Sequence, residues 1–329
     1  LSSFRKAILP FIAACGGMIF PVLVYYFLVT PGTPETQGMA IPMATDIAFS
    51  LGVLSLLGKR VPLSLKIFLT AIAVVDDIGG ILVIAFFYSS EVAYGYLIVA
   101  AILYTFLYYM GKFGMTQKIF FLFFGIIIWY LFLQSGIHST ISGVILAFVI
   151  PARPRLDAGK YIRRIRAIVS SFPVVQSDNI VLTNEQIATL KQVERASDRV
   201  ISPLQSLEDN LHGAVNFVSL PLFAFANAGV VFSGGGEVIG NVGLAVGLGL
   251  LLGKFLGIYL FTWLTIKSGL ARMPEGMNWK NIAGVSLLGG VGFTVSLFIA
   301  NLSFSDAYPE LLNQAKFGVL CGTIIAGIL

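Results

Sequence analysis

Long apolar segments that almost entirely lack charge limit the possible folds of this chain more than any other feature. A helix that crosses the hydrocarbon core of a bilayer needs roughly 20 mostly apolar residues. Such segments occur near residues 7–29, 41–57, 63–88, 93–110, 118–134, 137–150, 212–233, 239–267, 282–304 and 314–329. Because the bilayer core offers no water, the backbone of a spanning segment must satisfy its own polar groups. The sequence therefore predicts an all-α polytopic membrane protein with about ten spans.

The composition agrees with lipid as the main solvent. Of the 329 residues, 57% are hydrophobic and 11% are charged, whereas a soluble domain carries about 25% charged residues. Both cysteines, Cys15 and Cys321, lie in apolar segments and give neither a disulfide framework nor metal-ligand spacing. The basic residues lie in loops beside the spans, which indicates membrane topology and not a nucleic-acid-binding surface.

Charge in the loops decides between two topologies at Gln134–Gly136. A break there places nearly all of the 21 basic residues on one side of the membrane. A single helix over 118–150 would place Lys112 and Lys118 on the side opposite the basic loop 151–210. Because basic residues accumulate in cytoplasmic loops, we expect the break. We also expect the first residue and this loop in the cytoplasm, beside a bacterial inner membrane.

This loop separates two membrane domains, 1–150 with the first six spans and 211–329 with the last four. Within 151–210, Thr183 precedes Gln186 by three residues, which is a capping-box pattern. Apolar residues then recur near one helical face. We predict a cytoplasmic amphipathic helix, most simply a connecting element that packs on the membrane domain.

Four full charges remain inside the predicted spans, namely Asp46, Asp76, Asp77 and Lys254. Each costs about 2.5–3.5 kcal/mol at the bilayer centre, even on insertion scales. One acid and one lysine could be a structural pair, but three aspartates leave an excess of negative charge. Desolvation and a neighbouring carboxylate both favour a protonated aspartate, and carboxylate oxygens also suit an alkali cation. Competition between protons and a cation for these carboxylates is antiport in its simplest form.

Asp76 and Asp77 are adjacent in the sequence. Neighbouring side chains on a helix point about 100° apart. One aspartate can therefore line an ion path while the other faces Lys254 or a second helix. The same geometry argues against an aspartyl protease, whose two carboxylates face each other across a water.

Two spans contain residues that favour an interruption. Thr45 and Asp46 interrupt one, and Gly289–Ser296 brings three glycines and two hydroxyls to the middle of another. Unwound backbone at membrane depth is tolerated where it lines a cavity or is buried in protein. Close packing of small residues is the alternative for the second segment, and the preferred interpretation of the spaced glycines from Gly249 to Gly257.

The order of these spans repeats. Segments 7–88 and 239–329 each contain a full span, a broken span and a further span, and their predicted orientations are opposite. This order is typical of an inverted-repeat transporter with its site where the two broken helices cross. Broken helix ends carry dipole charges. Asp46 is placed to balance the positive ends and Lys254 the negative ones.

Several long runs resemble the NhaA family of sodium/proton antiporters. They are Gly38–Phe49, Arg60–Phe68, Asp76–Gly79, Ser135–His138, Leu220–Gly229, Gly253–Gly257 and Gly292–Ser296. The resemblance covers nearly all of the chain except 151–207. NhaA itself is a standard example of the inverted-repeat architecture.

The resemblance implies an electrogenic antiporter that exports Na⁺, or Li⁺, while more protons enter, by alternating access between discontinuous crossing helices. Asp76 and Asp77 would bind the ion and the protons, with Na⁺ held at this pair. Thr45, Asp46 and Lys254 would support the site, with Lys254 paired to Asp76. No cofactor is implied beyond the transported ions.

Weaker implications concern regulation and assembly. His138, Glu208 and His212 match positions tied to pH response in the family, although each also has an ordinary structural interpretation. The family has two helices ahead of Leu1, with a hairpin between them that mediates a homodimer. The loop 151–207 is longer than is typical of the family.

Three other functions compete with antiport. Sodium-coupled organic-anion symporters share the architecture, but a pair of aspartates is a poor host for an organic anion. A retinal protein could use Lys254 for a Schiff base, yet ten spans with two broken helices do not fit one. The protease is disfavoured by the adjacent aspartates, so we do not expect an enzyme.

Overall fold

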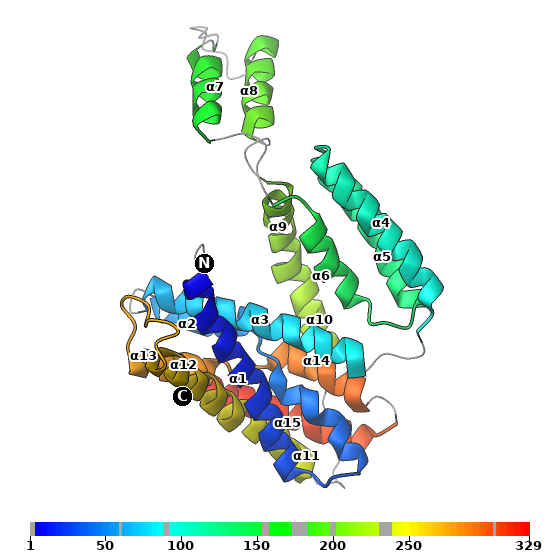
Figure 1. The fold of residues 1–329 in the computed structure, drawn as a ribbon, viewed down its shortest axis with the longest axis vertical. Coiled ribbons are helices and arrows are strands. Elements are labelled where there is room, and N and C mark those ends of the chain that lie inside the picture. Colours follow the sequence, from blue (N-terminus) through cyan, green and yellow to red (C-terminus); the bar gives the residue numbers. More distant parts are fainter. Residues whose placement is uncertain are drawn as a thin grey trace. The chain divides into compact units, whose positions relative to one another are not determined.

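The computed structural model describes residues 4–58, 61–87, 92–152, 158–170, 172, 183–197, 202–229, 239–304 and 307–329. All regular elements in these ranges are helices (Figure 1). Contacts divide the chain into two compact units, 1–88 with 220–329 and 89–219. The predicted span ends at residues 88 and 230–233, and Arg60 at the start of one matched run, lie outside the described ranges.

The first unit contains both predicted repeats. Its elements are α1 (Phe4–Leu28), η1 (Pro34–Met43), α2 (Ile47–Leu56), α3 (Leu63–Phe87), α10 (Leu220–Asn227), α11 (Gly240–Leu248), η4 (Gly249–Gly253), α12 (Lys254–Lys267), α13 (Trp279–Leu288), α14 (Phe293–Phe304) and α15 (Pro309–Ile328). Asn301 of α14 donates to Asn227 of α10 over 2.7 Å, which joins α10 to the rest of this unit.

Span candidates in the described ranges agree with a membrane protein. Five helices, α1, α3, α4 (Tyr94–Lys112), the continuous α11–α12 and α15, are long and apolar enough to cross a bilayer. The pairs η1–α2 and α13–α14 are each bent by 42° and would raise the number to seven. Two shorter apolar helices, α5 (Lys118–Gln134) and α6 (Thr140–Val149), are separated by the break predicted at Gln134–Gly136.

The first broken span is interrupted where predicted, but its start was wrong. A 3₁₀ helix begins at Pro34, seven residues before the predicted Ile41, and α2 follows the break at Ala44–Asp46. The polar residues after Pro34 carry no hydropathy signal, although proline at the first helical position favours a helix start. Pro42 lacks a backbone N–H, and this favours an early end to η1.

The second broken span is interrupted between Leu288 and Phe293, within the predicted glycine segment. A Cβ on Gly290 would meet the backbone carbonyl of Leu250, and one on Gly292 would lie 3.0 Å from that of Ala44. These glycines therefore both interrupt the helix and let two backbones approach it.

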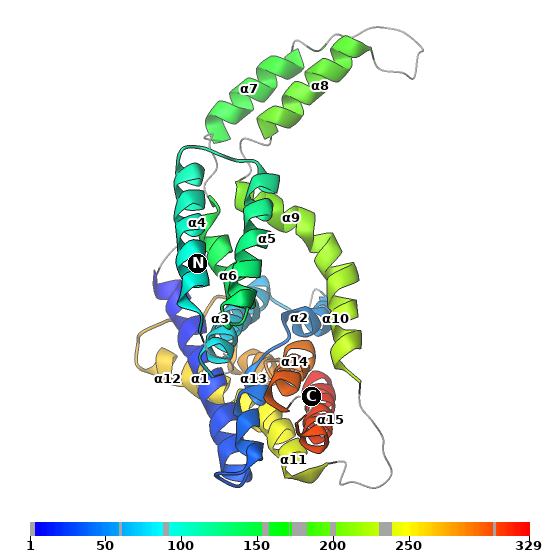
Figure 2. The same cartoon turned by 90° about the vertical axis from the view of Figure 1, so that its right-hand side faces the viewer.

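The spaced glycines of α11–α12 serve packing, as predicted. A Cβ on Gly249 would lie 2.8 Å from Pro42, and one on Gly253 would lie 2.5 Å from the Cα of Pro21. Gly257 meets the carbonyl of Gly16 on α1. Figures 1 and 2 show α1 beside α12, and the small residues allow this close approach.

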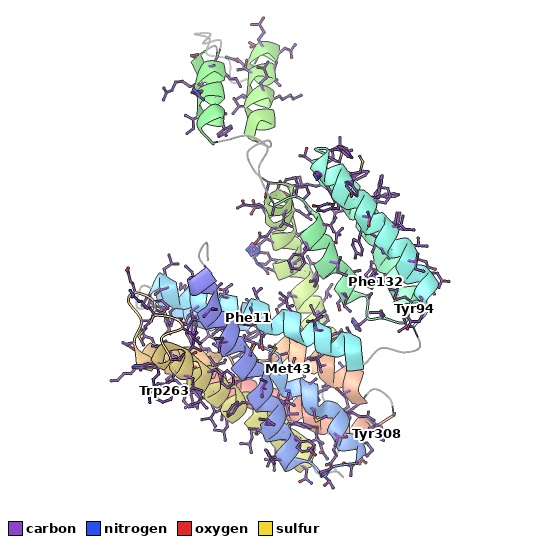
Figure 3. All side chains as sticks on the ribbon, in the orientation of Figure 1. Phe11, Met43, Tyr94, Phe132, Trp263 and Tyr308 are labelled. Atoms are coloured by element: carbon purple, nitrogen blue, oxygen red, sulfur yellow. The ribbon has the colours of Figure 1, made fainter. Side chains whose placement is uncertain are left out.

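The second unit contains α4, α5, α6, α7 (Ala158–Ser170), α8 (Asn184–Ser197), α9 (Pro203–Ala214) and the π-helix η3 (Val215–Ser219). A core of Tyr104, Leu107, Phe121, Ile128 and Phe132 joins α4 to α5. Phe132 of this core is labelled in Figure 3. The predicted capping box is confirmed, because Gln186 N–H donates to Thr183 Oγ1 over 3.3 Å and Thr183 N–H to Gln186 Oε1 over 2.9 Å.

Replacement of Gly257 by alanine tests the contact between α1 and α12. The new methyl group collides with backbone atoms of Gly16, which cannot rotate away, and we expect a loss of about 1–3 kcal/mol in stability. Thermal unfolding in detergent would measure the loss. Gly284→Ala is the matched control, because a Cβ there meets nothing within 4 Å. Equal melting temperatures for both variants would contradict the proposed contact.

Candidate functional site

The two helix breaks meet in the interior of the first unit. The backbone N–H of Asp46, in the first break, donates to the carbonyl of Val291, in the second, over 2.6 Å. Ser50 of α2 adds a hydrogen bond of 3.0 Å from its hydroxyl to the carbonyl of Leu288, the last residue of α13. The crossing predicted from the inverted repeat is therefore present, and direct hydrogen bonds join its two broken helices.

Asp46 lies at the N-terminal ends of two helices. Its Oδ1 accepts the backbone N–H of Phe49 over 3.0 Å at the start of α2. Its Oδ2 accepts the backbone N–H and the hydroxyl of Thr294, at 3.0 and 2.6 Å, at the start of α14. The side chain is buried, so the two positive helix ends and these three hydrogen bonds replace its hydration. This is the placement expected for Asp46.

Asp76 of α3 forms a fully buried salt bridge with Lys254, whose Nζ donates to Oδ2. The same oxygen lies 2.7 Å from the hydroxyl of Thr45, and this hydroxyl is also 2.8 Å from the carbonyl of Gly289. Lys254 directly follows η4, a π-helical turn of a kind often found at functional sites.

We made two predictions about Lys254. Its ion pair with Asp76 is the one that the resemblance implied. We also expected its charge to balance the negative helix ends. The carbonyl of Gly289, which caps the C-terminal end of α13, is instead met by the Thr45 hydroxyl. A neutral hydroxyl is sufficient there, since the lysine charge is already engaged by a carboxylate.

Asp76 and Asp77 each have one buried carboxylate oxygen that accepts no hydrogen bond from the described residues. These are the Oδ1 atoms of both residues, which have no hydrogen-bond partner in the described part of the chain. Leaving such a buried acceptor unsatisfied costs about 1–3 kcal/mol, and more for a charged group. Two unsatisfied carboxylate oxygens on consecutive residues can accept protons or coordinate a cation, and either would relieve this penalty.

Hydroxyl groups contribute more than we predicted. We named Thr45 as a site residue and noted the two hydroxyls of Gly289–Ser296 only as a sign of a break, but Ser50 and Thr294 also hold the crossing. Ser296 Oγ in α14 is buried and unpartnered. The signal for these residues was their concentration beside the breaks, since mid-span hydroxyls are otherwise satisfied by their own helix.

Two cavities of the first unit flank the aspartates along α3. One, of about 960 Å³, is lined by α1, α2 and the part of α3 from Lys66 to Val75. The other, of about 560 Å³, is lined by η1, α14 and Val83 of α3, among others. Met43, labelled in Figure 3, lies at the end of η1 and lines the second cavity. The pair thus lies between two hollows on the same helix.

The three candidates for pH response belong to the second unit, and the other five predicted site residues belong to the first. His138 precedes α6, with Nδ1 2.9 Å from Thr140 Oγ1. Glu208 is exposed on α9. Nδ1 of His212 lies 2.7 Å from Nδ2 of Asn216.

The buried salt bridge can be tested by removing the lysine side chain. Lys254→Ala leaves a desolvated carboxylate at Asp76, and we expect a loss of about 3–5 kcal/mol in stability, seen as a lower melting temperature in detergent. Adding Asp76→Asn to this variant should restore part of the loss. Lys280→Ala removes an exposed charge and is the control. An unaltered melting temperature in Lys254→Ala would remove its structural role.

Comparison with known proteins shows the family of this chain. The sequence model of the family described as "Na+/H+ antiporter 1" matches residues 1–329. The Na⁺/H⁺ antiporter NhaA of Bacteroides thetaiotaomicron is 75% identical over 329 residues, which are 100% of this chain and 75% of that protein. NhaA of Bacteroides fragilis is 77% identical with the same coverage.

More distant relatives carry the same name. NhaA of Porphyromonas gingivalis is 47% identical over 335 residues, covering 100% of this chain and 74% of that protein. This chain thus spans about three quarters of the length of these relatives. Since the family model matches every residue and the identities are this high, the chain belongs to the Na⁺/H⁺ antiporter 1 family of membrane proteins, as its resemblance to NhaA implied.

Proposed function

We propose that this protein exchanges Na⁺, or Li⁺, for H⁺ at Asp76 and Asp77. The observation that carries this proposal is the pair of buried, unpartnered Oδ1 atoms beside the crossing of two broken helices. Antiport is the activity in the names of its relatives. The protein is on this proposal a transporter and not an enzyme, with Na⁺ and H⁺ as cargo and no cofactor.

The surrounding contacts divide the work between the carboxylates. Asp46 is engaged by two helix ends, and Asp76 by Lys254 and Thr45. Of the three aspartates, Asp77 is the one whose negative charge would be compensated mainly by a bound proton or cation. We assign the exchange step principally to Asp77, with Asp76 joining it when the Lys254 contact loosens.

Competition produces coupling without any covalent step. A proton on either carboxylate removes the negative charge that Na⁺ needs, and a bound Na⁺ disfavours protonation of both. Two carboxylates can release two protons while a single Na⁺ takes their place. This difference supports an electrogenic exchange, in which more protons enter than sodium ions leave.

The cavities support alternating access. They reach α3 on either side of the pair, so a small movement of the broken helices could open one path while it closes the other. The carboxyl-rich centre also disfavours an organic anion as substrate, which argues against the symporter.

We further propose the bacterial inner membrane as the location, with the first residue and 151–210 in the cytoplasm, on the strength of the basic residues in the loops. The resemblance supports a homodimer and a role in pH response for His138, Glu208 and His212, and both remain proposals.

Asp77→Asn is expected to abolish exchange and leave the protein folded, because the amide is nearly isosteric but cannot carry the negative charge. In everted membrane vesicles with an internal pH dye, Na⁺ and Li⁺ but not K⁺ should dissipate the proton gradient. The variant should lose this response while keeping its melting temperature.

Glu310→Gln is the control for this experiment, since Glu310 is exposed at the start of α15. A sodium-responsive Asp77→Asn protein would show that the site is elsewhere. Absence of any response in the unmodified protein, at every pH, would instead favour a sodium-coupled symporter.

Competition also predicts a pH dependence. As the pH falls, protons occupy the carboxylates and the half-saturating Na⁺ concentration should rise, by up to about tenfold per pH unit for each proton displaced. The vesicle assay at several pH values measures it. A half-saturating concentration that does not change with pH would rule out a shared site. His138→Gln or His212→Gln should move the pH profile and leave this competition intact.

A further inference from the structure

Helices α7 and α8 form a hairpin whose charge is unequally distributed. They lie side by side and antiparallel (Figures 1 and 2). The sequence of α7 contains four basic residues and no acidic one, whereas acidic and basic residues balance in α8. Neither transport nor the proposed pH response uses this hairpin.

The apolar face of α7 is wider than its contact with α8. Helical residues advance by about 100°, so Tyr161, Ile165 and Ile168 share one face, and all three are half-buried. Ile162 and Val169, seven residues apart, form the edge of this face. They are 56% and 59% exposed. The hairpin partner therefore covers only part of the apolar surface of α7.

Helix α8 has an equivalent exposed edge. Gln186, Thr189 and Val193 are half-buried, while Ile187 and Leu190 are 38% and 46% exposed. Seen from its own N-terminus, each helix carries its exposed pair clockwise from the face turned to its partner. Because the helices are antiparallel, the two pairs fall on the same side of the hairpin and form one apolar strip.

Basic residues border this strip. Arg166 follows Ile162 by four residues and is therefore its neighbour on the helix surface, and Arg163 lies further round. Both arginines are exposed. An apolar strip bordered by cations is the pattern of a helix that lies in the interface of a membrane, with its apolar side chains among the acyl chains and its basic groups at the phosphates.

The hairpin is also held close to a bilayer. Only residues 150–157 separate it from the end of α6, and a chain of this length reaches at most roughly 30 Å. This tether keeps the local concentration of the membrane surface high. Cytoplasmic leaflets are negatively charged, which complements α7.

We propose that the strip formed by Ile162, Val169, Ile187 and Leu190 docks the α7–α8 hairpin onto an anionic lipid surface, with Arg163 and Arg166 at the headgroups. An acidic protein surface would match the charge as well. The bilayer is favoured because the same chain anchors the hairpin beside it. The docking in cells rests on the proposed cytoplasmic orientation of residues 151–210.

The test places an environment-sensitive fluorophore on the strip of the full-length protein. Ile162→Cys is labelled in a Cys15→Ala, Cys321→Ala background and reconstituted into vesicles of phosphatidylcholine alone or with phosphatidylglycerol. Both leaflets are alike in such vesicles, so the outcome depends neither on orientation nor on transport. We expect the emission to shift to shorter wavelength only with phosphatidylglycerol, and to return at high salt.

Two controls define the result. A label at Ala167, which is exposed on another face of α7, should keep the emission of a probe in water. Arg163→Gln with Arg166→Gln should abolish the shift. Arg272→Gln with Lys280→Gln, which remove the same charge from other exposed positions, should preserve it.

Three outcomes would overturn the proposal. A probe that stays in water in both kinds of vesicle would exclude docking on lipid and leave an acidic protein surface as the candidate. An equal shift in both would show insertion that does not require anionic lipid. A shift already present in neutral detergent would show that the strip leaves water without any anionic lipid.

Discussion

The salt bridge between Lys254 and Asp76 is the interaction on which the rest of the first unit depends. Both side chains are fully buried, and neither charge is tolerable there without the other. The pair therefore requires α12 and α3 to remain in fixed register. The close approach of α1 to α12, through Gly16 and Gly257, also holds α12 in its position.

Interrupting two helices at one place creates an electrostatic problem that the chain solves locally. Asp46 receives the free N–H groups of α2 and α14, and Thr45 meets the carbonyl of Gly289. These polar groups at the periphery of the crossing therefore have hydrogen-bond partners. At its centre, one oxygen of Asp76 and one oxygen of Asp77 have no hydrogen-bond partner in the part of the chain that the structure describes. These two oxygens are where the proposed function places the exchange of Na⁺ and H⁺.

Much of this arrangement was predictable from local features. Glycines and hydroxyls in the middle of apolar runs indicated both breaks, and the spacing of Thr183 and Gln186 indicated a helix start. The beginning of η1 was missed because hydropathy cannot detect a polar helical turn. The contacts of Ser50 and Thr294 were also missed, since the position of a hydroxyl beside a break does not say which group on another helix it will contact.

The sequence alone determined the solvent, the class of fold and the set of intramembrane charges. Backbone groups in lipid must be satisfied within helices, and each charge at that depth needs a partner. The chemistry of the residues left open which aspartate pairs with Lys254. The resemblance implied Asp76, and the tertiary structure shows this pair. Adjacent side chains point about 100° apart, and the rotation of α3 that chooses between them is set by its packing against other helices, which the local sequence does not contain.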